Sequence, residues 1–334
     1  MRRFLATMMV LALSADAYAG VGAVKTMRQP LPAKEVERSL NMPKGWLEFD
    51  FGAQRKIGVG SWTADGEKHL FDSTQWTYDT ARLDVRYGMS NRVEIWWSVP
   101  FHQARLTNEL QGTDTKDASL GDAWFGYRLN LSRQDSPLSD LVFEAAYKGP
   151  MGQEAPGTYL GGPLNVSSFV FTTGTPDAKL GFAGKRQFGP IALSAHAGYM
   201  KRFSGVVQYL VELDNYQFSG RMKPGDVIYG DVGLLGQVGV FAVQAQPEFQ
   251  QRFASRIGTT GPGLNPSSNL YEVEGSDGLS MDLRLTGTVN LTRGVDVSVM
   301  ALLPMMGEDL QFFPLEDIHP TYGNTYGATL ELRY

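Results

Sequence analysis

The fold is decided by the stretch Leu279-Ser-Met-Asp-Leu-Arg-Leu-Thr-Gly-Thr-Val-Asn-Leu291, in which apolar and polar side chains alternate. The same period of two recurs in Ala81-Arg-Leu-Asp-Val-Arg-Tyr87, where Arg82, Asp84 and Arg86 share one face and the apolar residues share the other. A helix cannot keep these three charges on one side, whereas alternation is the signal of a β-strand with two different faces. The sequence therefore predicts strands that separate an apolar from a polar environment.

Twelve such segments follow one another along the chain, and the connections between them fall into two length classes. Short connections such as Gly189–Pro190 alternate with long ones, which hold most of the prolines. Short turns at one end and long loops at the other are typical of outer-membrane barrels. We therefore predict an all-β fold, a closed antiparallel transmembrane β-barrel of about twelve strands with short periplasmic turns and long extracellular loops. The predicted strands lie near residues 45–53, 75–88, 92–106, 120–132, 138–148, 176–188, 191–203, 226–236, 240–253, 279–291, 295–303 and 325–334.

A helical membrane protein and a soluble β-sandwich are the alternatives to a barrel. After the N-terminal region no segment reaches the roughly 18 consecutive apolar residues that a transmembrane helix needs. Inside a bilayer every backbone N–H and C=O must be paired within the protein, and without helices only a closed barrel achieves this. A sandwich also alternates, but it has no reason to sort its connections into two length classes.

The N-terminus has the features of a secretory signal peptide. Arg2 and Arg3 precede the short apolar run Phe4–Leu13, and Ala17-Tyr18-Ala19 places small residues where a signal peptidase reads. We predict cleavage directly after this stretch and residence in the outer membrane. The predicted divisions are a signal peptide at 1–19, a periplasmic N-terminal segment at 20–44 and the barrel at 45–334.

The polar faces of the predicted strands carry charges in mid-strand. In a membrane-embedded barrel the apolar face meets lipid and the polar face lines the lumen. The candidate lumen-lining residues are Arg82, Asp84, Arg86, Glu94, Asp122, Arg128, Glu144, His196, Asp282 and Arg284.

This charged face has two interpretations. In one, mixed charges tune the selectivity of a permeation path. In the other, opposite charges on neighbouring strands, about 4.8 Å apart, pair and close a narrow barrel. A barrel of about twelve strands lies between filled eight-stranded barrels and open porins, which favours a narrow path over a general pore. We expect one charged patch inside the barrel, formed by Arg82, Arg86, Glu94, Asp122, Arg128 and Glu144.

The C-terminus resembles the assembly signal of outer-membrane barrels. In Tyr326-Gly-Ala-Thr-Leu-Glu-Leu-Arg-Tyr334, a glycine is followed by alternating apolar residues and the chain stops on an aromatic residue. The barrel-assembly machinery is the partner that such a signal implies. Closure requires this strand to pair with the first one, because an open sheet edge cannot persist in lipid. The residues assigned to the signal are Gly327, Leu330, Leu332 and Tyr334.

Three stretches in the first half of the chain carry further motifs. Arg86-Tyr-Gly-Met-Ser-Asn-Arg-Val-Glu-Ile-Trp-Trp-Ser-Val-Pro-Phe101 is a predicted hairpin, Ser119-Leu-Gly-Asp-Ala-Trp-Phe-Gly-Tyr-Arg128 holds a Gly-Asp strand, and Leu40-Asn-Met-Pro-Lys-Gly-Trp-Leu-Glu48 enters the first strand. Together they resemble the MetA-pathway-of-phenol-degradation family of outer-membrane transporters. Ser119 stands where the family has a glycine, and the motifs cover only about residues 38–210. The family's function is itself inferred largely from genetic context, so the resemblance implies a barrel more than a substrate.

The sequence does not indicate catalysis. His102 and His196 fall on polar faces near Ser98 and Ser194, but such spacing is commonplace along a strand. No cluster has metal-ligand spacing and no glycine-rich stretch forms a nucleotide loop, so we expect no enzyme activity, no metal and no cofactor. The net charge of −5 argues against a nucleic-acid partner.

We therefore predict an outer-membrane channel or transporter for small, apolar or aromatic, molecules, with outer-membrane lipid around it. The alternative is a structural or surface-interaction barrel whose long extracellular loops bind a partner. An outer-membrane hydrolase is a third and less favoured class.

Overall fold

The computed structural model describes residues 31–334 with the exception of 63–65, 71–73, 109–111, 133–139, 152–156, 161–164, 167–174, 212–215, 260–269, 273–276 and 308–320. The predicted signal peptide at 1–19 and the beginning of the predicted periplasmic segment lie outside the described residues. Within these described ranges no helix is long and apolar enough to cross a membrane.

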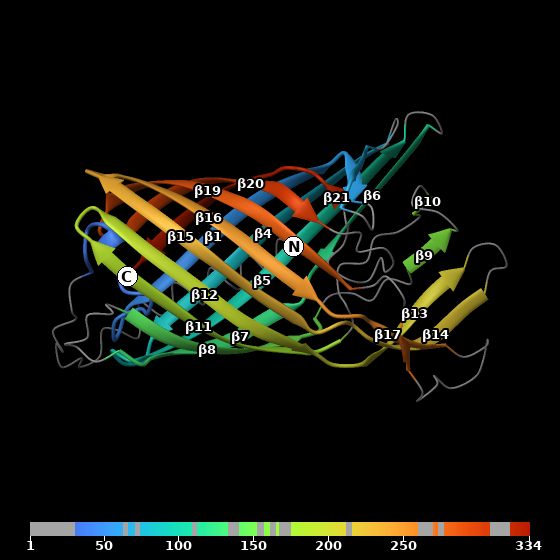
Figure 1. Cartoon of the computed structure of the whole chain (residues 1–334), viewed down its shortest axis with the longest axis horizontal. Coiled ribbons are helices and arrows are strands. Elements are labelled where there is room, and N and C mark those ends of the chain that lie inside the picture. Colours follow the sequence, from blue (N-terminus) through green and yellow to red (C-terminus); the bar gives the residue numbers. More distant parts are fainter. Residues whose placement is uncertain are drawn as a thin grey trace, which may run out of the picture. The chain divides into compact units, whose positions relative to one another are not determined.

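Twelve long strands of the described chain form one closed antiparallel barrel, which confirms the predicted fold (Figure 1). Each strand pairs with the next along the chain, and the first also pairs with the last, with Phe49 opposite Leu332. This pairing leaves no open edge within the ring, as a bilayer requires. The barrel strands are β1 (Leu47–Gly58), β4 (Thr74–Gly88), β5 (Val93–Asn108), β7 (Ala123–Asn130), β8 (Asp140–Gly149), β11 (Asp177–Phe188), β12 (Ile191–Arg202), β15 (Val227–Val238), β16 (Phe241–Arg252), β19 (Gly278–Thr292), β20 (Val295–Gly307) and β22 (Thr325–Arg333).

The connections make the two ends of the barrel different. At the short-turn end, Gly189 joins β11 to β12 and Gly239 joins β15 to β16, each with a φ of 61°. Two-residue hairpins need a positive φ at the first turn position, which glycine adopts at little cost. The opposite end, where the long connections lie, is called the long-loop end. In outer-membrane barrels these ends face the periplasm and the cell exterior respectively.

Several segments expected to be loops instead contain strands. β6 extends the pairing along the second half of β5, and other short strands form a six-stranded and a three-stranded sheet. Beyond the apolar band a strand can continue with polar side chains on both faces, so alternation alone does not reveal it. These elements are β2 (Gly60–Trp62), β3 (Lys68–Leu70), β6 (Thr113–Leu120), β9 (Gly157–Leu160), β10 (Asn165–Val166), β13 (Gly205–Val211), β14 (Tyr216–Lys223), β17 (Arg256–Thr259), β18 (Tyr271–Glu272) and β21 (Thr321–Tyr322).

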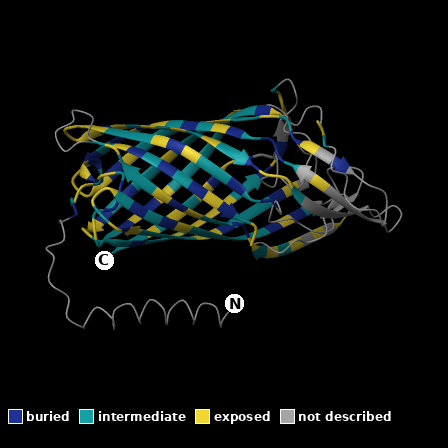
Figure 2. Cartoon of the chain, turned by 90° about the horizontal axis from the view of Figure 1, so that it is seen from below, coloured by how far each residue is buried: buried dark blue, intermediate teal, exposed yellow. Residues whose placement is uncertain are grey.

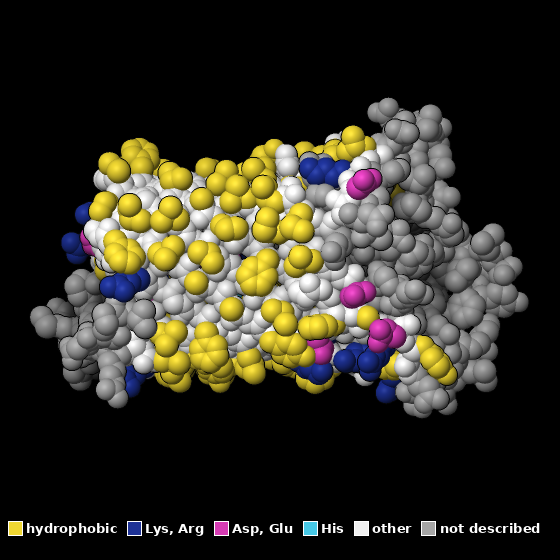
Figure 3. All heavy atoms as spheres, viewed as in Figure 1, with side chains coloured by type: hydrophobic (Ala, Val, Ile, Leu, Met, Phe, Trp, Pro, Cys, Tyr) yellow, Lys and Arg dark blue, Asp and Glu magenta, His cyan; other side chains and the backbone are white. Residues whose placement is uncertain are grey.

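The barrel wall separates an apolar exterior from a polar interior. Burial alternates along the strands, as Figure 2 shows, and hydrophobic side chains gather over the outside of the barrel in Figure 3. Phe182 and Leu234 are each 54% exposed on this outer surface, whereas Glu94 inside is fully buried. An exposed apolar belt over a buried polar interior is the arrangement that lipid favours and water does not.

The two faces give a direct test on neighbouring residues of β19. We expect Leu285→Arg to lower the free energy of unfolding by about 2–4 kcal/mol, because Leu285 lies on the exposed outer face and its replacement would meet lipid. Thr286→Arg should cost far less, since the next residue along a strand points to the opposite, lumen side. Reversible unfolding in urea from lipid vesicles measures both values. Equal losses at the two positions would contradict this assignment of faces.

Candidate functional site

The N-terminal segment, residues 31–44, lies inside the barrel at its short-turn end. It contains the single 3-10 turn η1 (Glu35–Glu37), in which Val36 is almost completely buried. Val36 clusters with Ala192, Leu235 and Ala242, which belong to three neighbouring barrel strands. An apolar side chain therefore anchors this segment against the inner wall.

Hydrogen bonds fasten the N-terminal segment to many strands of the wall. Because the segment has little regular structure of its own, its buried backbone groups take partners from wall side chains. With donors first, the bonds are Val36 N to Gln237 Oε1 at 3.1 Å, Leu40 N to Asp140 Oδ2 at 3.1 Å, Met42 N to Glu94 Oε2 at 2.7 Å, Arg86 Nη2 to Leu40 O at 3.0 Å, and Lys185 Nζ to the carbonyls of Glu35 at 2.9 Å and Arg38 at 2.8 Å. The segment thus spans the lumen and narrows it at this end.

One group makes the docking of this segment depend on pH. Burial raises the pKa of the Glu35 carboxyl above its ordinary value, and the positive charge of Arg38 only partly opposes this effect. The docked segment therefore favours the neutral acid. The contribution of Glu35 to docking is therefore largest at low pH and is lost as the pH rises through the pKa of the docked carboxyl.

A network of opposite charges crosses the same end of the lumen. At its centre is Glu94, to whose two oxygens Arg86 donates from Nε and Nη2, each at 2.9 Å. Arg128 lies 3.3 Å from Glu94 through Nη1 and 2.7 Å from Glu144 through Nε. Lys179 Nζ lies 3.0 Å from Glu144 Oε1 and ends this first arm of the network, which runs from Glu94 through Arg128 and Glu144. The charges alternate in sign from strand to strand, so each buried carboxylate has a cationic partner.

The second arm of the network runs from Arg86 to the N-terminal segment. Arg86 Nη1 donates to Glu48 Oε1 at 2.7 Å, and Arg333 bonds both Glu48 and Asp296. Arg38 of the N-terminal segment also bonds Asp296, which is completely buried. Charge as well as backbone hydrogen bonding therefore holds the segment in the lumen.

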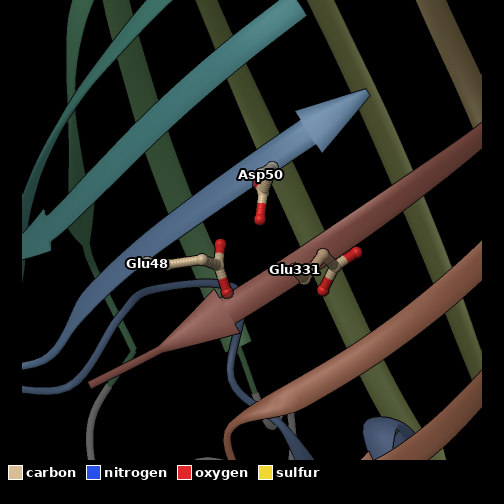
Figure 4. A group of neighbouring side chains, drawn as sticks. All are labelled: Glu48, Asp50 and Glu331. Carbon is tan, nitrogen blue, oxygen red and sulfur yellow. The ribbon is translucent and has the colours of Figure 1, made fainter. Parts of the chain in front are cut away.

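Three carboxylates meet beside this arm (Figure 4). Glu48 and Asp50 project from β1 and Glu331 from β22, with oxygen atoms within 4.8 Å of one another. Oxygen ligands at such spacing suit a divalent cation. However, Arg86 and Arg333 already bond Glu48, and Arg333 bonds Glu331. Ion pairing accounts for Glu48 and Glu331, and we assign no metal to the cluster.

A cavity of about 600 Å³ occupies the lumen on the long-loop side of the network. Tyr78 and His102 stack on its wall with ring centroids 5.2 Å apart, and the His102 Nδ1 lies 3.0 Å from Thr80 Oγ1. Trp124 adds a third ring, with the ammonium of Lys179 5.2 Å from its centroid. The cavity also takes in the apolar side chains of Met300, Leu302 and Pro100 and the cations Lys56, Arg82, Lys148 and Arg284.

In the ion pairs of the cavity wall, the arginine side chains are more exposed than the carboxylates. Arg82 is 2.7 Å from Asp84, yet the arginine side chain is 52% exposed and the aspartate 19%. Arg284 is 2.5 Å from Glu248 and is again the more exposed partner. In both pairs the guanidinium reaches further from the wall than its carboxylate. The cavity surface therefore presents more positive than negative charge.

The structure joins four of the six residues expected to form one patch, namely Arg86, Glu94, Arg128 and Glu144. Arg82 pairs within its own strand, and Asp122 pairs with Lys148 at 3.3 Å, further toward the long-loop end. Lys148 also lies 2.5 Å from Asp177. The expected patch is thus two groups, one fastening the N-terminal segment and one lining the cavity.

The remaining candidates lie apart from the network. His196 Nδ1 is 3.4 Å from Asp231 Oδ2, on strands β12 and β15. Asp282 stands opposite Glu248 in the β16–β19 ladder, next to the Arg284 pair.

Several members of the network were not among the predicted site residues. Glu48 lies on the first barrel strand and Arg333 on the last, which pair to close the barrel, and Asp296 is the second residue of β20. Each of these three residues lies on the polar face of its predicted strand, so the alternation of the sequence could have identified it as lumen-facing. Arg38 carries no such signal, because it precedes the first alternating segment and bonds a residue 258 positions away.

Known proteins are similar to this chain in fold and not in sequence. No protein-family model matches the chain, and no curated protein matches its sequence. An outer-membrane channel from Pseudomonas putida F1 aligns over 88% of this chain and 97% of its own, with a TM-score of 0.63 and 11% identity. The chain has the fold of an outer-membrane β-barrel.

Two further solved structures are more distant. The transport unit of the autotransporter AIDA-I from Escherichia coli covers 89% of this chain and 92% of its own, at 9% identity and a TM-score of 0.45. The P. putida toluene transporter TodX covers 86% and 89%, at 11% identity and a TM-score of 0.39. Likenesses this weak assign no function.

Proposed function

We propose that the protein is an outer-membrane channel for small apolar or aromatic molecules, closed at its periplasmic end by the N-terminal segment. The observation that carries this proposal is the lumen cavity, whose rings Tyr78, His102 and Trp124 stand beside apolar side chains. Rings and methylene groups offer contact area to an apolar solute, while a few polar groups orient it.

Closure of the lumen by the N-terminal segment is compatible with the passage of a solute. The segment is held by ion pairs and single hydrogen bonds rather than by a large apolar interface, as at Arg38–Asp296 and Met42–Glu94. Such contacts can be exchanged for water one at a time. A transported molecule would therefore occupy the cavity first and pass when the segment shifts.

A substitution that fills the cavity tests the proposal. Gly52 lines the cavity, and the nearest atom to an added Cβ is Thr329 Oγ1 at 3.5 Å, so the Cβ of Gly52→Trp meets no backbone clash. We expect it to lower uptake of small aromatic alcohols into proteoliposomes about 10-fold or more, because the indole would occupy the binding space. Phe51→Trp is the matched control, since Phe51 is exposed on the outer face.

The solute panel for this assay contains aromatic alcohols, alkanols and sugars of similar size. Faster uptake of the aromatic and apolar members by the wild type, lost in Gly52→Trp only, is the expected result. Uptake indistinguishable from protein-free vesicles would instead favour the surface-interaction barrel.

A further inference from the structure

The rim cluster comprises Tyr199, Lys201, Lys223, Asp226 and Arg256. It lies at the long-loop end, where β12, β14 and β17 end or begin. Tyr199 and Lys201 are alternate residues of β12 and share its outer face, with 39% and 45% exposure respectively. The cluster therefore faces the surroundings of the barrel and not its lumen. In Figure 3 basic and acidic side chains lie together at the long-loop border of the apolar belt.

One carboxylate organises the rim cluster. Asp226 Oδ2 accepts from Lys201 Nζ at 2.7 Å and from Tyr199 Oη at 2.6 Å, and Lys223 Nζ lies 3.8 Å away. Its Oδ1 accepts the backbone N–H of Arg202 at 2.9 Å, which fixes the side chain on the rim. Both oxygens are thus occupied, and two ammonium groups share a single negative charge.

A third cation extends the cluster across the next ladder. Arg256 is the cross-strand partner of Lys223, and the neighbouring Arg221 is exposed on the same face of β14. Arg256 has a weak, exposed partner in Glu272 at 3.6 Å. Among the residues that the structure describes here, four cations therefore stand near two carboxylates, an excess of positive charge.

Two other arginines at the long-loop end, Arg55 and Arg105, are each paired with one carboxylate. Arg55 donates from Nε and Nη2 to both oxygens of Asp79, at 2.6 and 2.8 Å. Arg105 makes the same two-bond pair with Asp114, both at 2.7 Å. Each of these two guanidinium groups has a carboxylate of its own, whereas Lys201 and Lys223 share Asp226.

The surroundings of the rim cluster are apolar. Ile228 is the cross-strand neighbour of Tyr199, and Phe203 and Phe253 are exposed just beyond the ends of their strands. Aromatic and aliphatic side chains beside cations are typical of the border between hydrocarbon and headgroups. A ligand fitting this surface has acyl chains beside an anionic headgroup.

We propose that the rim cluster binds the phosphorylated headgroup of lipopolysaccharide in the outer leaflet. Phosphate oxygens accept hydrogen bonds from ammonium and guanidinium groups. Lys201 and Lys223 approach the same oxygen of Asp226, and Arg256 stands opposite Lys223 in the next ladder. The acyl chains would lie along Ile228 and the adjoining apolar belt. A lipid bound here ties β12, β14 and β17 together at the cell surface.

Binding of lipid A to the purified full-length protein in nonionic detergent tests this site. Lys201→Gln with Lys223→Gln is expected to weaken binding of diphosphorylated lipid A about 25-fold, because each cation near a headgroup contributes about a factor of five. Arg55→Gln is the matched control and should bind like the wild type. Retention of the heat-modifiable gel band shows that each variant is folded, and Arg256→Gln, expected to lose about 5-fold, replaces the double variant if that one does not fold.

Dephosphorylated lipid A and inorganic phosphate test which part of the lipid the rim cluster recognises. Dephosphorylated lipid A should bind at least about 10-fold more weakly than the phosphorylated form, and inorganic phosphate alone should bind only at much higher concentration. Equal binding by wild type and both cluster variants would overturn the site. Equal affinity for the dephosphorylated lipid would overturn phosphate recognition, and phosphate binding as tightly as lipid A would overturn a lipid as its occupant.

Discussion

Replacing Glu94 with alanine is expected to lower the stability of the barrel by about 3–5 kcal/mol and to raise conductance through its lumen. Glu94 is completely buried and accepts from Arg86, Arg128 and the backbone N–H of Met42. Its removal leaves two guanidinium groups short of a partner and frees one attachment of the N-terminal segment. Breaking a buried charge pair from one side is costly because the remaining charge stays unpaired.

Conductance in planar bilayers and urea unfolding measure the two effects of Glu94→Ala. Glu248→Ala is the matched control, since Glu248 also pairs with an arginine inside the barrel but is 25% exposed and pairs with Arg284 of the cavity wall. We expect the control to lose less stability and to keep the wild-type conductance. Low salt gives the clearest comparison, because screening is then weakest. Unchanged conductance in Glu94→Ala would show that the segment does not control the path.

The face of the barrel wall on which each side chain lies was predictable, because it depends only on the alternation of residues along one strand. Leu285 and Arg284 are neighbours, and the structure places the first outside and pairs the second with Glu248 inside. No knowledge of the partner strand is needed for such an assignment. This is why an all-β barrel could be predicted from a single sequence.

The contacts within the lumen were less predictable, because they depend on register between strands. Asp84 and Asp122 are both on polar faces, yet Asp84 pairs within its own strand and Asp122 pairs with Lys148. A charge on a polar face has several possible partners, and one-residue steps of register decide among them. The expected single patch was therefore divided by geometry that the alternation does not contain.

Strand ends were misplaced for a related reason. The first strand was expected to end near residue 53, but β1 continues to Gly58 and carries Arg55 on its outer face. Arg55 pairs with Asp79 of β4 above the apolar belt, where an outward charge is compatible with a headgroup or aqueous environment. A charged residue thus marks the border of the membrane and not the end of the strand.

Changing Leu330 and Leu332 together to aspartate is expected to abolish assembly of the barrel. Both lie on the last strand, where Leu330 is opposite Phe51 and Leu332 opposite Phe49 of the first strand. The substitutions would place two carboxylates in lipid at the closing seam and remove the apolar pattern that the assembly machinery is expected to read. The folded, heat-modifiable band and the amount of protein in the outer membrane measure the outcome.

Deleting Tyr334 is a gentler change at the same seam and should give a partial loss. Its backbone exchanges two hydrogen bonds with Leu47, at 2.9 and 3.0 Å, and its ring stands edge-on to Phe49 with centroids 6.4 Å apart. Removal opens the last rung of the closing ladder.

A control separates an assembly signal from the general cost of charge in lipid. Leu193 and Leu234 are cross-strand neighbours on β12 and β15, and both are exposed on the outer face. Changing both to aspartate adds the same two carboxylates to the belt, away from the closing seam. If the C-terminal strand is read during assembly, this control should insert in reduced but measurable amount while the Leu330/Leu332 variant does not. Equal insertion of the two double variants would mean that lipid alone, and not recognition of the last strand, sets the cost.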